Sequence, residues 1–549
     1  MDTDRFFDRL DLGLATLAAD RPRWHLLFVG LLALILFLPG FFSVPPIDRD
    51  EARFAQASRQ MVASGDLIDI RLGEDTRYKK PVGIYWLQSA ARALVGPDHD
   101  QQIWVYRLPS LVAAVGAVLL TYLIALSLAN AQAALLAAVL MASCFVLGGE
   151  ARVAKTDAAL LASILAAQLA LARLWMGQRA LPWLFWGALA ASVLLKGPIG
   201  VMVVGLTLLA LIVIRRGVGW LAPLRWGRGL LLFLAIVLPW YVLITLKSGA
   251  AFWDEALGRD LLAKIGEGQE SHGAPFGTYA LAVWATFWPA SILLPFGLWF
   301  AWVARREAAV LFCLAWILPS WLVFELTATK LIHYVLPTYP ALAVLCAMGW
   351  AQRGDDRLGL GYRIFLGAAL VFALVLAGVS AGMGIYGGYW PGLYWLLGLV
   401  ITGGGIWATW VSVRRLDRLA PVLGLSLLTL GLTISLFSHL ARFDYMWPSP
   451  QLAAMVRDAG CADGPLISVG YEEPSLLFVA PRLPRFTSAA DAVARAKAAD
   501  CAIVLVEARE QAAFDAALGQ QAPSVLGTIT GFNLGKSRDV AITGYGFGG

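Results

Sequence analysis

Charge is scarce in this 549-residue chain: 15% of its residues are Asp, Glu, Lys or Arg, whereas 59% are hydrophobic. Soluble domains average about a quarter charged residues. A core surrounded by water cannot bury so much apolar surface, so the composition excludes an ordinary soluble protein and predicts a polytopic α-helical membrane protein. The net charge of +6 requires no nucleic acid partner, because Lys and Arg collect in the cytoplasmic loops of membrane proteins.

Cysteine is also rare, and the absence of a CxxC or Cys/His cluster excludes a structural zinc site. Cys144, Cys313 and Cys346 lie in apolar segments, where cysteine behaves as a small hydrophobe. Cys461 and Cys501 lie in the polar C-terminal region. They can pair if that region faces an oxidising compartment, and the sequence leaves their pairing open. The chain also lacks a Walker phosphate loop, which excludes ATP as an energy source.

Apolar runs of about 20 residues, the length of a membrane-spanning helix, recur along most of the chain. The first ends in Pro45-Pro46 without a small-x-small cleavage site, so we interpret it as an uncleaved span. With a cytoplasmic N-terminus, most arginine clusters fall on the cytoplasmic side, and an odd number of spans places the C-terminus outside. We predict about thirteen spans, at residues 25–44, 108–128, 131–148, 157–175, 181–196, 199–214, 229–246, 277–302, 308–327, 335–351, 363–383, 392–412 and 419–440.

Two stretches stand apart from the spans: the first loop (residues 45–107) and the tail (residues 442–549). In the first loop, segments 50–62 and 81–94 carry apolar residues at three- and four-residue steps, which predicts two amphipathic helices that frame a pocket at the membrane surface. The chain is therefore expected to divide into a transmembrane domain at 1–441 and a small soluble α/β domain at 442–549. The tail elements are predicted as strands at 465–470, 502–506, 524–532 and 539–545 and helices at 451–458, 491–499 and 511–518.

The candidate catalytic carboxylates lie at the start of the first loop. Asp50 and Glu51 belong to a run in which five of six residues, from Asp48 to Arg53, are charged. An acid at a helix start also satisfies free backbone N–H groups, but capping explains one carboxylate and not this whole run. Asp157, at the outer mouth of a span, is the third catalytic candidate, and a helix cap is the simpler interpretation there as well.

Cations and aromatic residues recur on the same, outer side. Lys80, beside Tyr78 and Tyr85, suits a phosphate clamp with aromatic faces for a sugar or an isoprenoid, although a patch touching lipid headgroups is the simpler interpretation. A second cluster surrounds Pro337, where broken, polar sequence predicts irregular backbone that lines a cavity. The candidate substrate-binding residues are Arg53, Tyr78, Lys80, Tyr85, Arg259, His272, Lys330, His333, Tyr334 and Tyr339.

Together these features predict a cavity at the outer leaflet that binds an anionic lipid. Activated sugars outside the cytoplasm are lipid-linked, because nucleotide sugars are cytoplasmic. A polyprenyl phosphate sugar fits both the cations and the apolar walls. The residues leave the metal requirement open. A divalent cation is a possible cofactor, and the sequence assigns no ligands to it.

The motifs resemble those of the GT-C membrane glycosyltransferases related to protein O-mannosyltransferases, and within these the bacterial 4-amino-4-deoxy-L-arabinose (aminoarabinose) lipid A transferases. The resemblance rests on Asp50-Glu51-Ala52-Arg53-Phe54-Ala55, Tyr78-Lys79-Lys80-Pro81-Val82-Gly83-Ile84-Tyr85-Trp86, Leu195-Lys196-Gly197-Pro198 and Lys330-Leu331-Ile332-His333-Tyr334-Val335-Leu336-Pro337. It covers the chain from the first loop to past the middle, and the tail adds little to it.

The resemblance implies a bacterial inner-membrane enzyme with a periplasmic active site and tail. Such an enzyme transfers aminoarabinose from undecaprenyl phosphate to lipid A, the lipopolysaccharide modification behind polymyxin resistance. It implies Asp50 as the main catalytic carboxylate, with Lys80 and Arg259 on the lipid phosphate. The residue before Lys80 is often acidic in that family, whereas here it is Lys79. Two alternatives stay open: a protein O-glycosyltransferase of the same fold, and a polyprenyl-lipid transporter.

Overall fold

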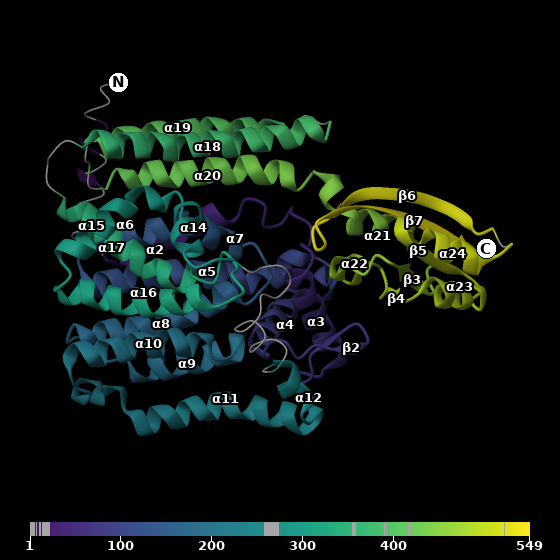
Figure 1. Ribbon diagram of the computed structural model, residues 1–549, viewed down its shortest axis with the longest axis horizontal. Helices are drawn as coiled ribbons and strands as arrows, with labels where there is room; N and C mark the ends of the chain where they lie inside the picture. The colour runs from purple at the N-terminus through teal and green to yellow at the C-terminus, as the bar shows by residue number, and fades with distance from the viewer. Residues whose placement is uncertain are drawn as a thin grey trace.

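A body of apolar helices that run side by side carries a small mixed sheet at one end (Figure 1). The computed structural model describes residues 22–256, 258, 274–353, 358–388, 390, 392–415, 417, 419–520 and 522–548, with residues 6, 8, 9, 12 and 13. The body helices are α2 (Pro22–Phe37), α5 (Ile103–Leu128), α6 (Ala131–Ser143), α7 (Phe145–Glu150), α8 (Asp157–Trp175), α9 (Pro182–Lys196), α10 (Ile199–Arg215), α11 (Trp226–Ser248), α14 (Thr278–Thr286), α15 (Leu294–Val303), α16 (Ala308–Leu326), α17 (Tyr339–Gln352), α18 (Leu360–Tyr386), α19 (Leu393–Arg415) and α20 (Pro421–Leu440).

Each of the thirteen predicted spans falls on these helices, which confirms the polytopic helical fold. Within the described residues, seven helices are long and apolar enough to cross a membrane, and the bent pair α14–α15 brings the number to eight. Four of the five remaining predicted spans fall on the shorter apolar helices α2, α6, α9 and α10, and span 335–351 falls on α17.

Three predicted spans are broken rather than continuous. Span 277–302 bends by 112° between α14 and α15, around Pro289, which has no N–H to continue a helix. Span 131–148 is interrupted at Cys144, whose backbone is extended. Span 335–351 begins with a 3-10 turn, η6 (Leu336–Thr338), before α17. The irregular backbone predicted around Pro337 is confirmed by η6, whereas the breaks at Cys144 and Pro289 were not predicted.

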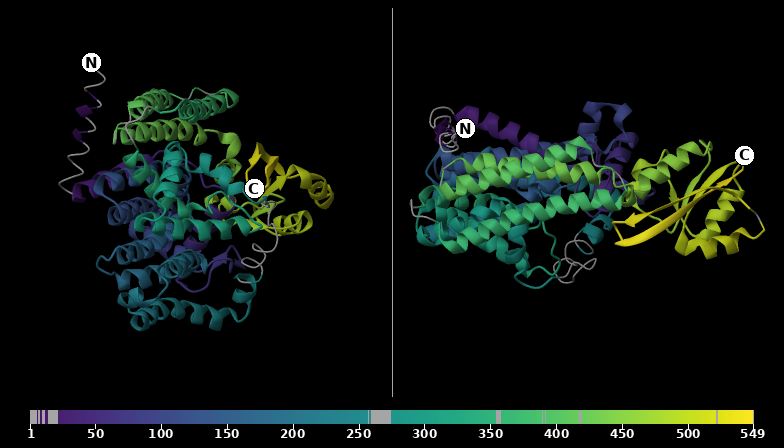
Figure 2. Two further views of the ribbon diagram at one scale, coloured as in Figure 1. Left: turned by 60° about the vertical axis from the view of Figure 1, so that its left-hand side comes forward. Right: turned by 90° about the horizontal axis from the view of Figure 1, so that it is seen from above.

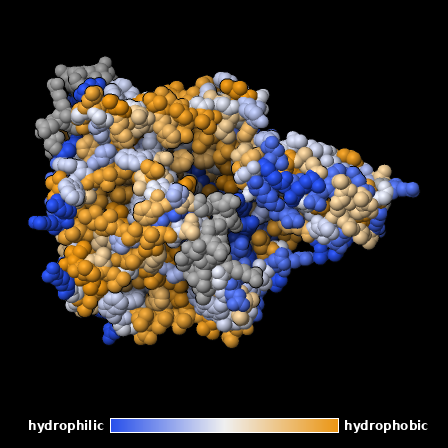
Figure 3. All heavy atoms as spheres, viewed as in Figure 1, coloured by the Kyte–Doolittle hydropathy of each residue, from blue (hydrophilic) through white to orange (hydrophobic). Residues whose placement is uncertain are grey.

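The outside of the body is apolar, as a lipid-facing surface must be. Hydrophobic residues cover the helical part of the face in Figure 3, whereas the tail is largely hydrophilic. Only 22% of the most apolar window of α11 and 28% of that of α18 are buried inside the protein. These helices expose apolar side chains that water would not tolerate, so lipid is their solvent.

The first loop forms the two predicted helices, α3 (Asp50–Ser64) and α4 (Gly83–Val95), which pack against each other. The first turn of α3 carries Asp50 and Glu51, whose charges suit the positive end of the helix dipole. Its predicted apolar face, Phe54, Ala57 and Met61, is buried. A short hairpin of β1 (Arg71–Leu72) and β2 (Asp75–Thr76) connects α3 to α4, and α12 (Ala251–Trp253) lies further along the chain.

The tail folds as the predicted α/β domain, with a five-stranded sheet in the order β4-β3-β5-β7-β6. Strand β3 is parallel to β4 and β5, and β7 is antiparallel to β5 and β6. The two-residue strand β4 and helix α22 were not predicted. The elements are α21 (Pro448–Asp458), β3 (Leu466–Val469), α22 (Pro474–Val479), β4 (Arg485–Phe486), α23 (Ala489–Lys497), β5 (Ala502–Glu507), α24 (Gln511–Leu518), β6 (Ser524–Asn533) and β7 (Arg538–Phe547).

A disulfide joins Cys461 to Cys501, just before β3 and β5, because these neighbouring parallel strands bring their starts together. Cys144, Cys313 and Cys346 are buried thiols, as predicted. The tail packs on the first loop through α22 and α3 (Figures 1 and 2). The first loop and the tail therefore lie on the same side of the body, as the odd number of spans predicts.

Candidate functional site

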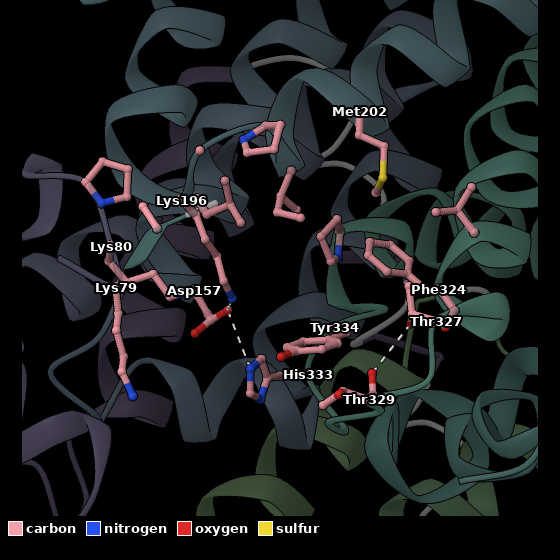
Figure 4. Close-up of a pocket in the computed structure, with 18 of the residues that line it drawn as sticks. Lys79, Lys80, Asp157, Lys196, Met202, Phe324, Thr327, Thr329, His333 and Tyr334 are labelled. Atoms are coloured by element: carbon pink, nitrogen blue, oxygen red, sulfur yellow. Dashed lines mark hydrogen bonds and ion pairs between the residues drawn. The ribbon is translucent and has the colours of Figure 1, made fainter. Parts of the chain in front are cut away.

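A pocket of about 520 Å³ opens between the first loop and the ends of the body helices. Figure 4 shows Lys79, Lys80, Asp157 and Lys196 toward one side of it and Met202, Phe324 and Thr327 toward the other. The pocket is therefore amphipathic, with a charged mouth and an apolar interior. Its apolar lining comes mainly from Leu160, Leu161, Ile199, Met202, Tyr241, Phe252, Trp253, Val323, Phe324, Leu326, Leu336 and Pro337.

Asp157 is the centre of an ion cluster at the charged side. Its Oδ1 lies 2.5 Å from Lys196 Nζ, and its Oδ2 lies 3.7 Å from Lys155 Nζ. His333 Nε2 is 3.6 Å from Asp157 Oδ1. The Lys196 ammonium also lies 5.3 Å from the centre of the Tyr334 ring, a cation–π contact. The structure thus brings together the predicted residues Asp157, His333 and Tyr334 in one place.

Glu150 is a further member of this cluster, in contact with Lys155 and His333. Its Oε1 lies 2.9 Å from Lys155 Nζ and 3.7 Å from His333 Nδ1, and its Oε2 has no hydrogen-bond partner among the described residues. Burial raises the pKa of Glu150, although the charge of Lys155 opposes the shift. Burial also lowers the pKa of His333 to about 3, so this imidazole is neutral at physiological pH.

Asp50 presents its carboxylate next to this cluster, at the first turn of α3. Its Oδ1 lies 3.7 Å from Arg77 Nη2, and 59% of the side chain is exposed. The protein atoms around the carboxylate would raise its pKa by desolvation, but the charges of Arg77, Lys155 and Lys80 outweigh them and lower it. Asp50 is therefore an ionised carboxylate that is surrounded by positive charges and accessible to a ligand.

Glu51 points the opposite way, and its position argues against the predicted catalytic role. The side chain is fully buried, and Arg107 Nε and Nη2 each donate to one of its oxygens at 2.8 Å. The backbone N–H groups of Ala154 and Ile47 donate to the same two oxygens. With both oxygens hydrogen-bonded and no exposed surface, Glu51 is placed to stabilise the fold and not to reach a ligand.

Three predicted binding tyrosines are buried in a similar way. Tyr85 is 0% exposed and packs on Phe54, and Tyr339 is 0% exposed with its hydroxyl bonded to Thr286. Tyr78 is 5% exposed and donates to Asp69. These positions make the tyrosines supports of the site, because none of them lines the pocket. Of the four tyrosines predicted to contact a sugar, Tyr334 lines the pocket.

The remaining candidates divide between the pocket mouth and positions further away. Lys80 lines the pocket, and Arg53 contributes to lowering the pKa of Asp50. Lys330 instead closes a turn, since its Nζ donates to the carbonyls of Ala274 and Thr327. Arg259 and His272 lie outside the described residues, and their roles stay predictions.

Two residues important to the site were missed from the sequence. Glu150 sits at the end of an apolar run, and its partners Lys155 and His333 become visible only in three dimensions. Arg107, at the outer end of α5, was likewise not singled out. A charged residue at the edge of a span needs a partner, and that rule was the available signal for both.

No group of three or more His, Cys, Asp and Glu side chains in the described part of the chain is arranged to hold a metal ion. The sequence leaves the metal requirement open, and no ligands are assigned to a divalent cation.

Sequence comparison places the chain near membrane sugar transferases. The family model described as dolichyl-phosphate-mannose-protein mannosyltransferase matches residues 79–243. The undecaprenyl phosphate-alpha-4-amino-4-deoxy-L-arabinose arabinosyl transferase of Pseudomonas aeruginosa (strain UCBPP-PA14) is 27% identical over 378 residues, 64% of this chain and 66% of that protein. The enzyme of the same name from Pectobacterium carotovorum subsp. carotovorum (strain PC1) is 30% identical over 378 residues, 65% of this chain and 64% of that protein. The matches span just under two thirds of the length of these relatives.

The structural comparison extends over almost the whole chain. The crystal structure of ArnT from Cupriavidus metallidurans bound to undecaprenyl phosphate superposes with a TM-score of 0.74 at 18% sequence identity. The match covers 95% of this chain and 98% of that one. The comparisons confirm the resemblance that the motifs indicated and the GT-C type of fold, with its helical body and small C-terminal domain.

Proposed function

We propose that this chain, which shares the fold of ArnT and sequence similarity with the aminoarabinose transferases, is a lipid-linked-sugar-dependent glycosyltransferase. It transfers 4-amino-4-deoxy-L-arabinose from undecaprenyl phosphate to a phosphate of lipid A. The reaction takes place at the periplasmic face of the bacterial inner membrane, where the first loop and the tail lie together.

The observation that carries this proposal is the amphipathic pocket. Asp50 lies outside its lining but near enough for the charge of Lys80 to lower the pKa of its carboxyl group. A polyprenyl phosphate has an apolar chain and an anionic head, and the pocket offers an apolar interior and a mouth that includes Lys79 and Lys80. Asp157 adds little negative charge there, because Lys196 and Lys155 flank it. Charge and hydrophobicity thus match the two halves of such a donor.

The chemistry follows from the leaving group. A phosphate departs as an anion, so it needs stabilising charge more than a general acid. Lys80 supplies that charge from the pocket mouth, and we assign the same role to Arg259. The sugar passes through an oxocarbenium-like state, and the nearby Asp50 carboxylate stabilises the positive charge that develops on the sugar.

Asp50 does not need to act as a base in this reaction. A lipid A phosphate is already anionic and attacks without losing a proton. The lowered pKa of Asp50 keeps it ionised, which suits electrostatic stabilisation and recognition of an ammonium group on the sugar. If the acceptor were a hydroxyl, the same carboxylate would instead have to accept its proton.

The test compares lipid A from matched strains that express the wild-type chain, Asp50→Asn or no copy, under conditions in which the donor is made. We expect a species heavier by one aminopentose with the wild type only. In purified form, Asp50→Asn should lower turnover by roughly 100- to 1,000-fold with an unchanged melting temperature, because its side chain is exposed. Near-normal turnover of this variant would remove Asp50 from the mechanism.

Unmodified lipid A in all strains would contradict the proposed acceptor. Newly glycosylated exported proteins would then identify a protein O-glycosyltransferase, and donor binding without sugar transfer would identify a transporter.

A further inference from the structure

The tail contacts the two residues that directly precede Asp50. Arg49 donates from Nε and Nη2 to the carbonyl oxygen of Gly535, at 3.1 and 2.7 Å. The Asp48 carboxylate accepts a hydrogen bond from the backbone N–H of Ser475 at 3.1 Å. Both contacts join residues more than 400 positions apart in the chain.

The backbone at this point adopts a conformation that needs support. Arg49 has φ 72° and ψ −117°, a region that residues with a Cβ rarely occupy. Such conformations persist where the surrounding structure holds them in place. Arg49 is also the residue before the first turn of α3, and it makes no side-chain cap on that helix. Its guanidinium instead reaches the tail.

The tail makes these contacts from one end of its sheet, where β3 and β6 terminate. Ser475 follows the carboxyl end of β3, and Gly535 lies in the turn between β6 and β7. In α/β sheets the carboxyl ends of parallel strands are the usual place for a ligand, and here the first loop occupies it. The turn is close-packed, since a Cβ at Gly535 would come within 2.8 Å of Glu473 Oε2.

The described lining of the pocket contains no tail residue, because all of it lies between Lys79 and Pro337. The tail therefore does not cover the pocket in this structure. The tail reaches the start of α3 through the side chains of Asp48 and Arg49. Further along the same helix, Arg59 donates to the tail carbonyl of Phe478.

We propose that the tail is a positioning domain for Asp50, and that Asp48 and Arg49 are positioning residues through which it sets the direction of that carboxylate. The inference rests on the proposed function, since it concerns the residue that we assign to catalysis. A fixed carboxylate contributes to catalysis only while its orientation is maintained, and small displacements cost large factors in rate.

The experiment removes the hydrogen bonds between Arg49 and Gly535 without changing a residue of α3. Arg49→Gly introduces a residue that adopts positive φ readily, and it removes the two hydrogen bonds to Gly535. We expect kcat to fall roughly 10- to 100-fold with little change in the KM for the donor. The matched control is Gln101→Ala, which removes a hydrogen bond from the first loop to the tail carbonyl of Ala480, far along the chain from Asp50. The control should keep the wild-type kcat.

A pair of variants at Asp48 separates positioning from mere folding. Asp48→Asn keeps an oxygen that accepts from Ser475 and should retain most of the activity, whereas Asp48→Ala should lower kcat as Arg49→Gly does. Hydrogen exchange at the amides of residues 47–53 should quicken in Arg49→Gly and Asp48→Ala but not in Asp48→Asn or Gln101→Ala.

The outcomes distinguish the two proposals. If the wild type transfers sugar and Asp50→Asn does not, a wild-type kcat in Arg49→Gly overturns the positioning role alone. If the wild type transfers no sugar, the proposed function fails. Hydrogen exchange then decides the inference by itself, because unchanged protection at residues 47–53 in Arg49→Gly overturns it.

Discussion

Asp50 and Glu51 are neighbours on the same helix, yet they belong to opposite kinds of surroundings. Glu51 is fully buried in a closed network with Arg107, in which both of its oxygens are bonded. Asp50 is 59% exposed and forms an ion pair with Arg77 at 3.7 Å. Consecutive helical residues point about 100° apart, so one turn of α3 serves both the interior and the pocket side.

The comparison teaches that accessibility, more than charge, separates a structural acid from a reactive one. The closed network around Glu51 also includes the carbonyls of Phe41 and Val44, which accept from Arg107 Nη1. It therefore ties the end of the first span to the first loop. Removing the buried Glu51 carboxylate should lower stability, whereas removing the exposed Asp50 carboxylate should lower turnover.

The largest effect is expected at the closed network. Glu51→Ala leaves the Arg107 guanidinium buried without its counter-ion, and breaking a buried pair in this way costs about 3–5 kcal/mol. The melting temperature of the purified protein should fall strongly. Asp50→Ala is the matched control, since removal of an exposed carboxylate should leave it nearly unchanged. A stable Glu51→Ala variant that has lost only turnover would overturn the distinction between the two acids.

The next effect concerns the two adjacent lysines at the pocket mouth, which Figure 4 shows extending in different directions. Lys80→Met removes a charged partner of the donor phosphate, an interaction worth about 1.5–3 kcal/mol. The affinity for undecaprenyl phosphate should therefore fall roughly 10- to 100-fold. Lys79→Met, a change of the same size at a more exposed residue, should have a much smaller effect. Titration of each purified variant with the lipid phosphate measures both values, and equal losses would contradict a specific role for Lys80.

The smallest effect concerns the pH dependence of the contact between Asp48 and Ser475, beside Asp50. Burial raises the pKa of Asp48 to about 6, with Glu473 raising it further and Ser475 and Arg53 lowering it. Because an undocked carboxyl titrates near 3.9, the docked state binds more protons between about pH 4 and 6. Docking should therefore weaken as pH rises from about 4 to 6 and level off above that range.

We expect a change of roughly 3- to 10-fold in the opening equilibrium between pH 7.5 and 5.5. Hydrogen exchange at residues 47–53, corrected for the intrinsic rate, measures it. Asp48→Asn should remove the pH dependence, and persistence of the dependence in that variant would assign it to another group.

Much of the fold followed from hydrophobicity and periodicity. Apolar runs predicted every body helix, and three- and four-residue steps predicted α3 and α4, because each pattern reports which face is removed from water. The breaks at Cys144 and Pro289 were missed, since they depend on packing between helices. The disulfide stayed open in the sequence because it required two strands to be neighbours.

The site was less predictable for the same reason. Asp50 and Lys80 belong to charged stretches of the first loop, and Asp157 lies at the end of a span, so sequence alone indicated them. The distinction between Asp50 and Glu51 depends on Arg107, which is 56 positions from Glu51. The contribution of Glu150 depends on contacts that no local pattern reports.

The anchoring of Arg49 by Gly535 also has a consequence for the order of biosynthesis. The two residues are 486 positions apart, and a chain grows at roughly 5–20 residues per second. The start of α3 therefore leaves the ribosome roughly 25 to 100 seconds before its anchor is made. Throughout that interval the nascent protein already contains Asp50 but cannot yet hold it in place. A chain that stops before Gly535 should therefore insert into the membrane with Asp50 unanchored, and its turnover should be lowered as in Arg49→Gly.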